Sequence, residues 1–209
     1  MRHIRHASTE AMRLVREHRA AFIAIHAGYL GLFLVGIGLT AVIPELRPGG
    51  LGALGADTGA QGVGTVIADA YRSGNVALAA AVTLAVNLLL ASIVQTTLPS
   101  LVVPFLGVLL TLARALSWGV LFTPFGAQDS TFLIHYVTLA IEGAAYATVG
   151  FAAWVQGRRV VQPQRFGLPT RRAGWLAGLR ATASLYLWVV VLLIVGALYE
   201  AVTVIAFIA

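Results

Sequence analysis

The stretch "NVALAAAVTLAVNLLLASIVQTTL", residues 75–98, decides the fold because it carries no charged side chain. As a helix it would be about 36 Å long at 1.5 Å per residue, and the hydrocarbon core of a bilayer is about 30 Å thick. An uncharged run of this length is typical of a transmembrane helix. The sequence therefore predicts that this segment crosses a membrane.

Four more runs are similarly long and mostly apolar: Phe22–Ile43, Leu101–Phe122, Phe132–Val155 and Leu185–Ala209. The composition agrees, since the chain is 59% hydrophobic and 11% charged, whereas soluble domains carry roughly 25% charged residues. We predict an all-α, polytopic transmembrane helix bundle of about five spans, with residues 22–209 forming a single domain. Pro99–Ser100 is the predicted turn between the second and third spans, and Pro104 falls in the first turn of the third.

The distribution of arginine predicts the orientation. Residues 1–21 and the loop 156–184 are rich in arginine, whereas the loop 44–74 carries acidic residues. Cytoplasmic segments of membrane proteins hold an excess of basic residues, so we expect a multi-pass cell-membrane protein with its N-terminus in the cytoplasm and its C-terminus outside. The expected membrane-surface or partner-binding residues are Arg13, Arg16, Arg19, Arg158, Arg159, Arg171 and Arg172.

The N-terminal segment has an amphipathic pattern. Arg13, Arg16 and Arg19 recur every third residue, which places them on one stripe of a helix. A basic amphipathic helix binds the anionic inner leaflet with its axis in the plane of the membrane. We predict such an interfacial helix here, and the alternative is a solvated extension of the first span. In the outer loop, a glycine-rich irregular half is expected to precede a short helix over residues 63–74.

Four polar residues interrupt the predicted spans at a similar depth. Asn87, Arg114, Glu142 and Glu200 lie roughly 13–18 Å from the outer ends of their helices at 1.5 Å per residue. An unpaired charge at the centre of a membrane helix costs about 2.5–3.5 kcal/mol. We therefore predict that Arg114 pairs with Glu142 or Glu200. Asn87 is expected at the edge of this cluster, and His135 on the same helix face as Glu142.

Two interpretations of the cluster remain open. In the structural one, buried ion pairs fix the register of the helices. In the functional one, the polar residues mark the path of a proton, an ion or a substrate. A glutamate paired with arginine is a poor proton carrier, because the arginine keeps it ionised. Two acids for one arginine would leave one acid less firmly held.

Residue types needed for other chemistry are missing or scattered. The chain has no cysteine, and its five histidines show no metal-binding spacing such as H-E-x-x-H. No nucleophile–base pair is evident, and the arginines flank apolar spans instead of forming a basic–aromatic stripe. We therefore expect no enzyme activity, no cofactor or metal, and no nucleic-acid partner.

Small residues predict close helix packing in two places. Gly28, Gly31, Gly36 and Gly38 lie in the first span, and the fourth span has a small-residue face at Gly143, Ala147 and Gly150. Small side chains allow membrane helices to approach closely. The fifth span is one expected neighbour of the second face.

Four segments place one polar residue in an apolar run: "LAVNLLLASI" (84–93), "ARALSWG" (113–119), "IEGAAYATVGF" (141–151) and "VVVLLIVGALYEAVTVIA" (189–206). Together they resemble the stage II sporulation protein M family of integral membrane proteins. Under this resemblance, Asn87, Glu142 and Glu200 match polar positions of the family. Arg114 stands where the family usually has asparagine, and Thr138 stands where it has histidine.

The resemblance implies a role without catalysis, because sporulation relatives act as membrane scaffolds in an envelope-remodelling complex with peptidoglycan hydrolases. The leading hypothesis is a non-enzymatic scaffold or assembly subunit of a cell-envelope complex, whose partners are the lipid bilayer and other membrane or envelope proteins. The family's layout is also similar to the permease half of ABC-2-type exporters. The alternative is therefore a homodimeric permease-type subunit that works with a cytoplasmic ATPase. A permease predicts a water-accessible cavity at the cluster, whereas a scaffold predicts a dry and fully paired cluster.

Overall fold

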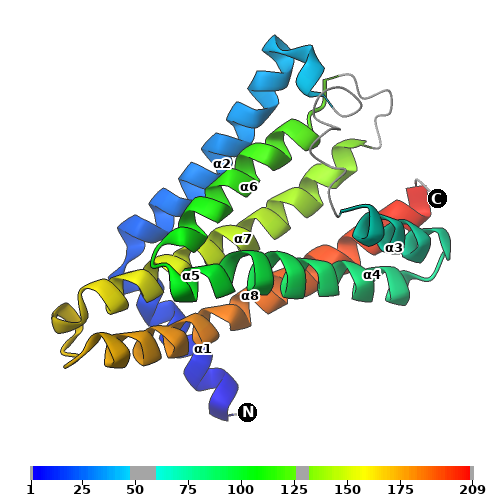
Figure 1. Cartoon of the computed structure of the whole chain (residues 1–209). Coiled ribbons are helices and arrows are strands. Elements are labelled where there is room, and N and C mark those ends of the chain that lie inside the picture. Colours follow the sequence, from blue (N-terminus) through cyan, green and yellow to red (C-terminus); the bar gives the residue numbers. More distant parts are fainter. Residues whose placement is uncertain (1, 48–59, 126–131, 208–209) are drawn as a thin grey trace.

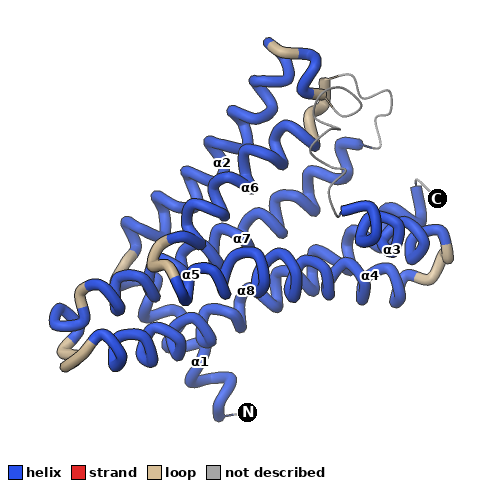
Figure 2. The backbone as a smooth tube through the Cα atoms, viewed as in Figure 1, coloured by secondary structure: helices blue, strands red, loops and turns tan. Residues whose placement is uncertain are grey.

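A computed structural model describes residues 2–47, 60–125 and 132–207. These residues form helices and short connections without any strand (Figure 1, Figure 2). The all-α prediction is therefore confirmed. Two predicted features lie outside the described residues, namely the glycine-rich part of the outer loop at 48–59 and the last two residues of the fifth span.

Most elements are α-helices, and three segments have another helical geometry. The α-helices are α1 (Arg2–Glu17), α2 (Arg19–Val42), α3 (Ala60–Arg72), α4 (Val76–Ala85), α5 (Leu98–Val102), α6 (Leu106–Leu121), α7 (Phe132–Val161) and α8 (Arg171–Phe207). Short 3₁₀ turns form η1 (Pro44–Leu46) and η4 (Pro163–Phe166), and η3 (Val86–Thr97) is a π-helix.

In the described part of the chain, four continuous helical stretches are long and apolar enough to cross a membrane: Arg19–Val42, Val76–Val102, His135–Val161 and Arg171–Phe207. Their outward surfaces carry large exposed side chains, such as Leu30 and Leu34 of α2 and Val191 and Val195 of α8. Soluble proteins rarely expose contiguous apolar surface on this scale, so these helices indicate a membrane protein. The remaining predicted span corresponds to α6, which has 16 residues and is shorter than the about 20 residues of an ordinary crossing.

The predicted turn at Pro99–Ser100 is wrong, because the helix continues through these residues to Val102. Proline fixes a backbone angle that suits a helix, and Pro99 lies at the junction where the π-helix η3 changes to the α-helix α5. The chain reverses instead at residues 103–105, so Pro104 lies in the turn, where Phe105 has a φ of 69°. The Phe105 ring lies against Gly157 of α7, since a Cβ there would come within 2.7 Å of it.

The predicted cytoplasmic loop 156–184 is also largely helical. α7 continues to Val161, α8 begins at Arg171, and the chain reverses between them through η4 and Gly167, whose φ is 67°. An apolar run of sequence indicates which part of a helix lies in the lipid. The helix itself continues until a residue such as Pro163 stops it. The two helices pack closely here, because a Cβ on Gly174 of α8 would lie 2.1 Å from the Arg159 carbonyl oxygen.

α7 forms the centre of the bundle. In its candidate span, His135–Val161, 72% of the most apolar window is buried, against 22–28% for the other three candidate spans. It packs against α2 and α6 on one side and α8 on the other (Figure 1). The predicted small-residue face of α7 is covered by α2 and α6, since Gly143 lies against Tyr29 and Gly150 against Thr111.

The helices α2 and α6 approach each other closely. A Cβ on Gly36 would lie 2.3 Å from the Leu116 carbonyl oxygen, and a Cβ on Gly119 would lie 1.9 Å from the Phe33 carbonyl oxygen. By contrast, a Cβ on Gly38 would meet nothing within 4 Å. The predicted packing role of the first-span glycines therefore holds for Gly36 and not for Gly38.

Replacing Gly36 by leucine is expected to separate α2 from α6. Overpacking a close contact costs about 1–3 kcal/mol or more, so the Gly36→Leu variant should unfold at a clearly lower temperature in mild detergent. Gly38→Leu is the matched control, because it adds the same volume to the same helix in open space. Equal midpoints for the two variants would show that the α2–α6 contact is not close.

The segment predicted to lie at the inner leaflet is the helix α1, and its apolar side is partly covered by the protein. Ala11 and Leu14 are fully buried in a core cluster that includes Leu185 of α8. The predicted short helix of the outer loop is confirmed as α3. Ile67 and Tyr71 of α3 pack in a cluster with residues of α4 and α8.

Candidate functional site

A cavity of about 240 Å³ opens between α4, η3, α6, α7 and α8, and Ile67 of α3 also lines it. We call it the polar chamber, because it collects polar side chains within an apolar bundle: Thr83, Asn87, His135, Thr138, Glu142 and Glu200. Four of the five residues predicted to share a site are therefore brought together. Thr83 was not predicted, since a threonine in an apolar run carries no distinctive signal.

Glu142 is the most deeply placed acid, with 4% of its surface exposed. Its carboxylate accepts a hydrogen bond of 2.5 Å from the Asn87 side-chain amide. Gly196 of α8 faces it, and a Cβ there would lie 3.0 Å from the Glu142 Cγ. A small residue at 196 thus leaves room for the carboxylate between α7 and α8.

Glu200 follows Gly196 by one helical turn. Its Oε1 lies 3.8 Å from the His135 Nε2, which links α8 to the beginning of α7. The Tyr71 hydroxyl shares a 2.9 Å hydrogen bond with the Thr83 hydroxyl, and the Glu200 carboxylate lies near it. Burial and then the nearby Glu200 carboxylate raise the pKa of Tyr71, so this phenol keeps its proton at neutral pH.

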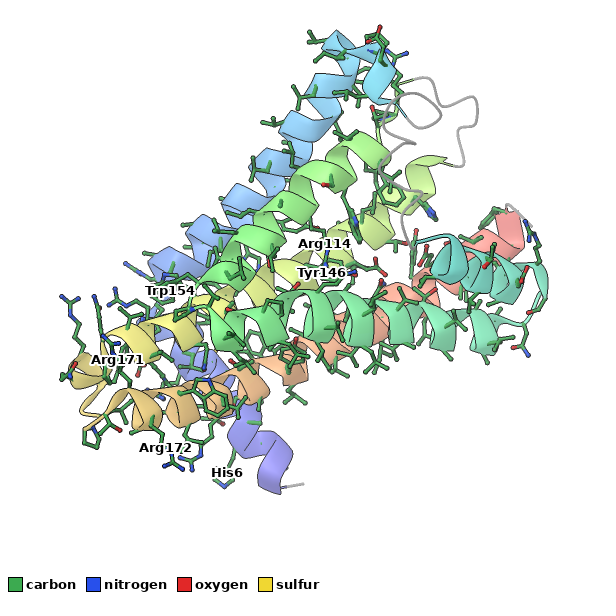
Figure 3. All side chains as sticks on the ribbon, in the orientation of Figure 1. His6, Arg114, Tyr146, Trp154, Arg171 and Arg172 are labelled. Atoms are coloured by element: carbon green, nitrogen blue, oxygen red, sulfur yellow. The ribbon has the colours of Figure 1, made fainter. Side chains whose placement is uncertain are left out.

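The predicted Arg114–glutamate pair is wrong. The two terminal nitrogens of Arg114 donate to the Ala91 carbonyl oxygen, each at 3.1 Å, and one also donates to Gln95 Oε1 at 2.8 Å. Its guanidinium lies over the Tyr146 ring at 4.8 Å (Figure 3). Within residues 2–47, 60–125 and 132–207, no salt bridge joins Arg114 to either glutamate.

The π-helix η3 explains this arrangement. π-helical turns are wider than α-helical ones and are frequent at functional sites. Side chains bond to its carbonyl oxygens: Ser92 donates to Asn87 at 2.8 Å, Thr96 to Ala91 at 2.8 Å, and Tyr186 of α8 to Ser92 at 3.0 Å. Arg114 therefore holds the π-helix that carries Asn87, and it leaves the glutamates without an arginine. Residue types alone gave no signal of this helix.

The predicted surface arginines are exposed or make local contacts. Arg13 forms salt bridges with Glu10, at 2.5 Å, and with Glu17 on its own helix. Arg158 lies over the Trp154 ring at 5.4 Å, and Arg159 donates to the Ala177 carbonyl oxygen at 2.6 Å. The others, Arg16, Arg19, Arg171 and Arg172, are exposed. Arg171 and Arg172 lie near the end that carries Trp154, away from Arg114 (Figure 3).

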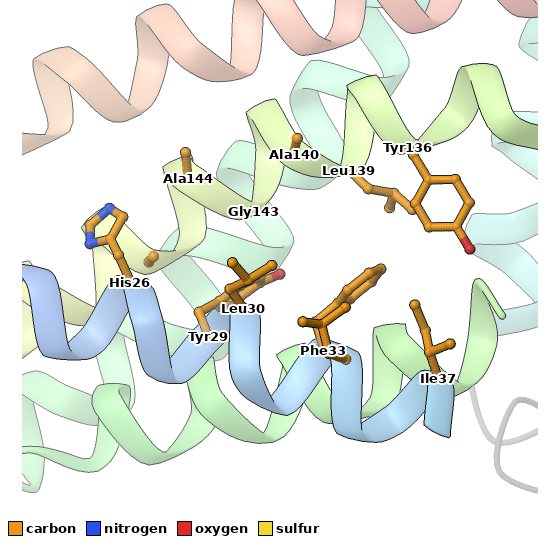
Figure 4. A pocket seen from close by; sticks show the side chains of 12 residues that line it. His26, Tyr29, Leu30, Phe33, Ile37, Tyr136, Leu139, Ala140, Gly143 and Ala144 are labelled. Carbon is orange, nitrogen blue, oxygen red and sulfur yellow. The ribbon is translucent and has the colours of Figure 1, made fainter. Parts of the chain in front are cut away.

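A larger cavity of about 450 Å³ lies between α2 and α7 and is mainly apolar (Figure 4). His26 stands at one end and Tyr136 at the other, with Leu30, Phe33 and Ile37 along α2. None of the membrane carboxylates lines it. The polar chamber is therefore the candidate site for chemistry that involves charge.

The fold and the chamber define the class of this protein as an α-helical membrane protein with two carboxylates in an internal cavity. No family model, no curated protein and no solved structure matches the chain. Across the described parts of the chain, no three histidine, aspartate or glutamate side chains gather in a way that could hold a metal ion.

Proposed function

We propose that the protein is a permease-type transmembrane subunit that passes protons through the polar chamber. The observation that carries this proposal is the pair of carboxylates, Glu142 and Glu200, in one cavity, where no described arginine forms a salt bridge with either. Chains of glutamate, aspartate and histidine inside membranes mark proton relays. An acid held by arginine would stay ionised, and neither acid here is held in that way.

The ionisable side chains of the polar chamber lie in an order that suits the transfer of a proton from one to the next. Glu142 and Glu200 lie at neighbouring levels along α8, because Glu142 packs against Gly196 of α8 and Glu200 follows about 6 Å further along that helix. His135 stands 3.8 Å from Glu200 and can accept a proton from it. A small rotation of the side chains, or one bridging water molecule, would connect Glu142, Glu200 and His135 by hydrogen bonds.

The proposal includes the five-span topology in the cell membrane, with the N-terminus inside. Short apolar helices such as α6 cross a bilayer by local thinning. The arginines near the α7–α8 turn would then lie in the cytoplasm, and α1 would lie along the inner leaflet. The exposed arginines at this end supply a surface for a cytoplasmic ATPase, and two copies of the chain would form the permease.

A scaffold or assembly subunit of an envelope complex is the second candidate. It is supported by the resemblance to the sporulation family and by Arg114, whose contacts with η3 are structural. A scaffold predicts a fully paired polar cluster, and the cavity beside the two glutamates favours the permease-type alternative.

Proton flux into liposomes distinguishes the two candidates. The purified chain is reconstituted into vesicles that contain a pH-sensitive dye, and a potassium diffusion potential drives protons inward. We expect acidification faster than in protein-free vesicles. A rate equal to that of protein-free vesicles, with the chain correctly folded, would contradict proton passage and favour the scaffold.

A further inference from the structure

A third cavity, of about 340 Å³, lies between α1, α7 and α8 and is lined by basic side chains. Arg13 comes from α1, Arg159 from the last turn of α7 and Arg180 from the first part of α8, and Glu10 and Ser184 complete the polar lining. We call it the basic pocket. It shares no residue with the polar chamber, so its role is independent of the proposed proton path.

The basic pocket holds three arginines and one acid, Glu10, so its side chains carry a net positive charge. Arg13 is already neutralised by Glu10 and Glu17 on its own helix. Arg159 makes one backbone hydrogen bond, to Ala177, and lies 5.9 Å from the centre of the Phe166 ring. Among the residues that the structure describes, neither Arg159 nor Arg180 forms a salt bridge. Both guanidinium groups therefore keep N–H donors for an anion.

The position of the pocket along α8 fits the headgroup layer of the membrane. Arg180 lies five residues, or about 7.5 Å, before Leu185, where the long apolar run of α8 begins. Trp175 and Trp188 flank the pocket residues on the same helix, and tryptophan is enriched at membrane–water interfaces. A charged group of a lipid would reach this level from the side of the bundle.

We propose that the basic pocket binds the phosphate of an anionic phospholipid headgroup, with Arg159 and Arg180 as its ligands. The planar guanidinium group matches phosphate oxygens in a bidentate geometry. Basic pockets between helices on the cytoplasmic side of membrane proteins bind such headgroups. The bound lipid would join α7 and α8 to α1, whose Glu10–Arg13 ion pair forms one wall of the pocket.

Native mass spectrometry of the full chain in mild detergent tests this site. Phosphatidylglycerol and phosphatidylcholine with identical acyl chains are titrated separately. We expect one phosphatidylglycerol to be retained more tightly than phosphatidylcholine. The Arg159→Gln/Arg180→Gln variant should lose about 30-fold in phosphatidylglycerol affinity, at about fivefold for each arginine near the lipid surface.

The control is Arg171→Gln/Arg172→Gln, which removes the same charge from exposed positions at the start of α8. It should change the affinity about threefold or less. The single variant Arg180→Gln alters only an exposed side chain, so its expected fivefold loss remains measurable if the double variant does not fold. Equal losses in the test and control variants would overturn the proposal. Inorganic phosphate that binds as tightly as phosphatidylglycerol and displaces it would assign the pocket to free phosphate instead of lipid.

Discussion

Replacing Glu142 by glutamine is expected to reduce proton flux in reconstituted liposomes about tenfold or more, because an amide cannot carry a proton through the chamber. The fold should survive, since the glutamine oxygen can still accept the hydrogen bond from Asn87. The same reduction is expected for Glu200→Gln, whose carboxylate lies in the same cavity. Flux is measured at equal protein content under the same membrane potential.

The control for this experiment is Glu45→Gln, which neutralises an exposed acid in η1, far along the chain from the chamber. It should keep the flux of the unmodified protein. If Glu142→Gln and Glu200→Gln also keep that flux, the chamber is not a proton path. If instead both variants fail to assemble while the unmodified chain shows no flux, the scaffold hypothesis gains support.

The second large effect is expected at Arg114. Arg114→Met removes a guanidinium group that donates to Ala91 and Gln95, and hydrogen bonds from charged groups contribute about 1.5–3 kcal/mol each. The free energy of unfolding in mild detergent should fall by an amount in this range. The protein is destabilised because η3 loses its hydrogen bonds from Arg114. No acid loses a counter-ion in this variant.

A double-mutant cycle separates these two explanations. Arg114→Met combined with Gln95→Leu should show an interaction energy of about 0.5 kcal/mol or more, since the side chains are in direct contact at 2.8 Å. Combined with Glu142→Gln, the interaction energy should be smaller, because these two residues are linked only indirectly, through η3 and Asn87. An interaction energy between Arg114 and Glu142 that exceeds the one between Arg114 and Gln95 would support the ion pair that the sequence predicted.

The outcome at the polar cluster shows what depth along a helix can predict. Counting residues from the helix ends brought Asn87, Glu142 and Glu200 to one level, and the structure places all three in one cavity. Depth says nothing about direction around the helix axis, so it did not show that Arg114 faces Ala91 and Gln95. A π-helix adds to this uncertainty, because its wider turns change which side chains share a face.

The helix boundaries show a second limit. Hydrophobicity correctly located the apolar core of each helix, yet α7 and α8 extend well beyond their apolar runs into the arginine-rich segment. A helix ends where a residue such as Pro163 or Gly167 stops it, and polarity alone does not stop it. Conversely, Pro99 did not mark the turn, because it lies inside the helical stretch Val76–Val102, at the junction of η3 and α5.

The most direct test of the central claim is the access of water to the polar chamber. The chain has no cysteine, so single cysteines can be labelled with a water-soluble, positively charged thiol reagent. Thr138 lines the chamber, and Thr111 lies in the packed contact between α6 and α7. Both are buried, and neither hydroxyl has a hydrogen-bond partner among the residues that the structure describes. The proposal predicts that Thr138→Cys is labelled in the folded protein and Thr111→Cys only after denaturation. Labelling of both only after denaturation would contradict a water-accessible chamber.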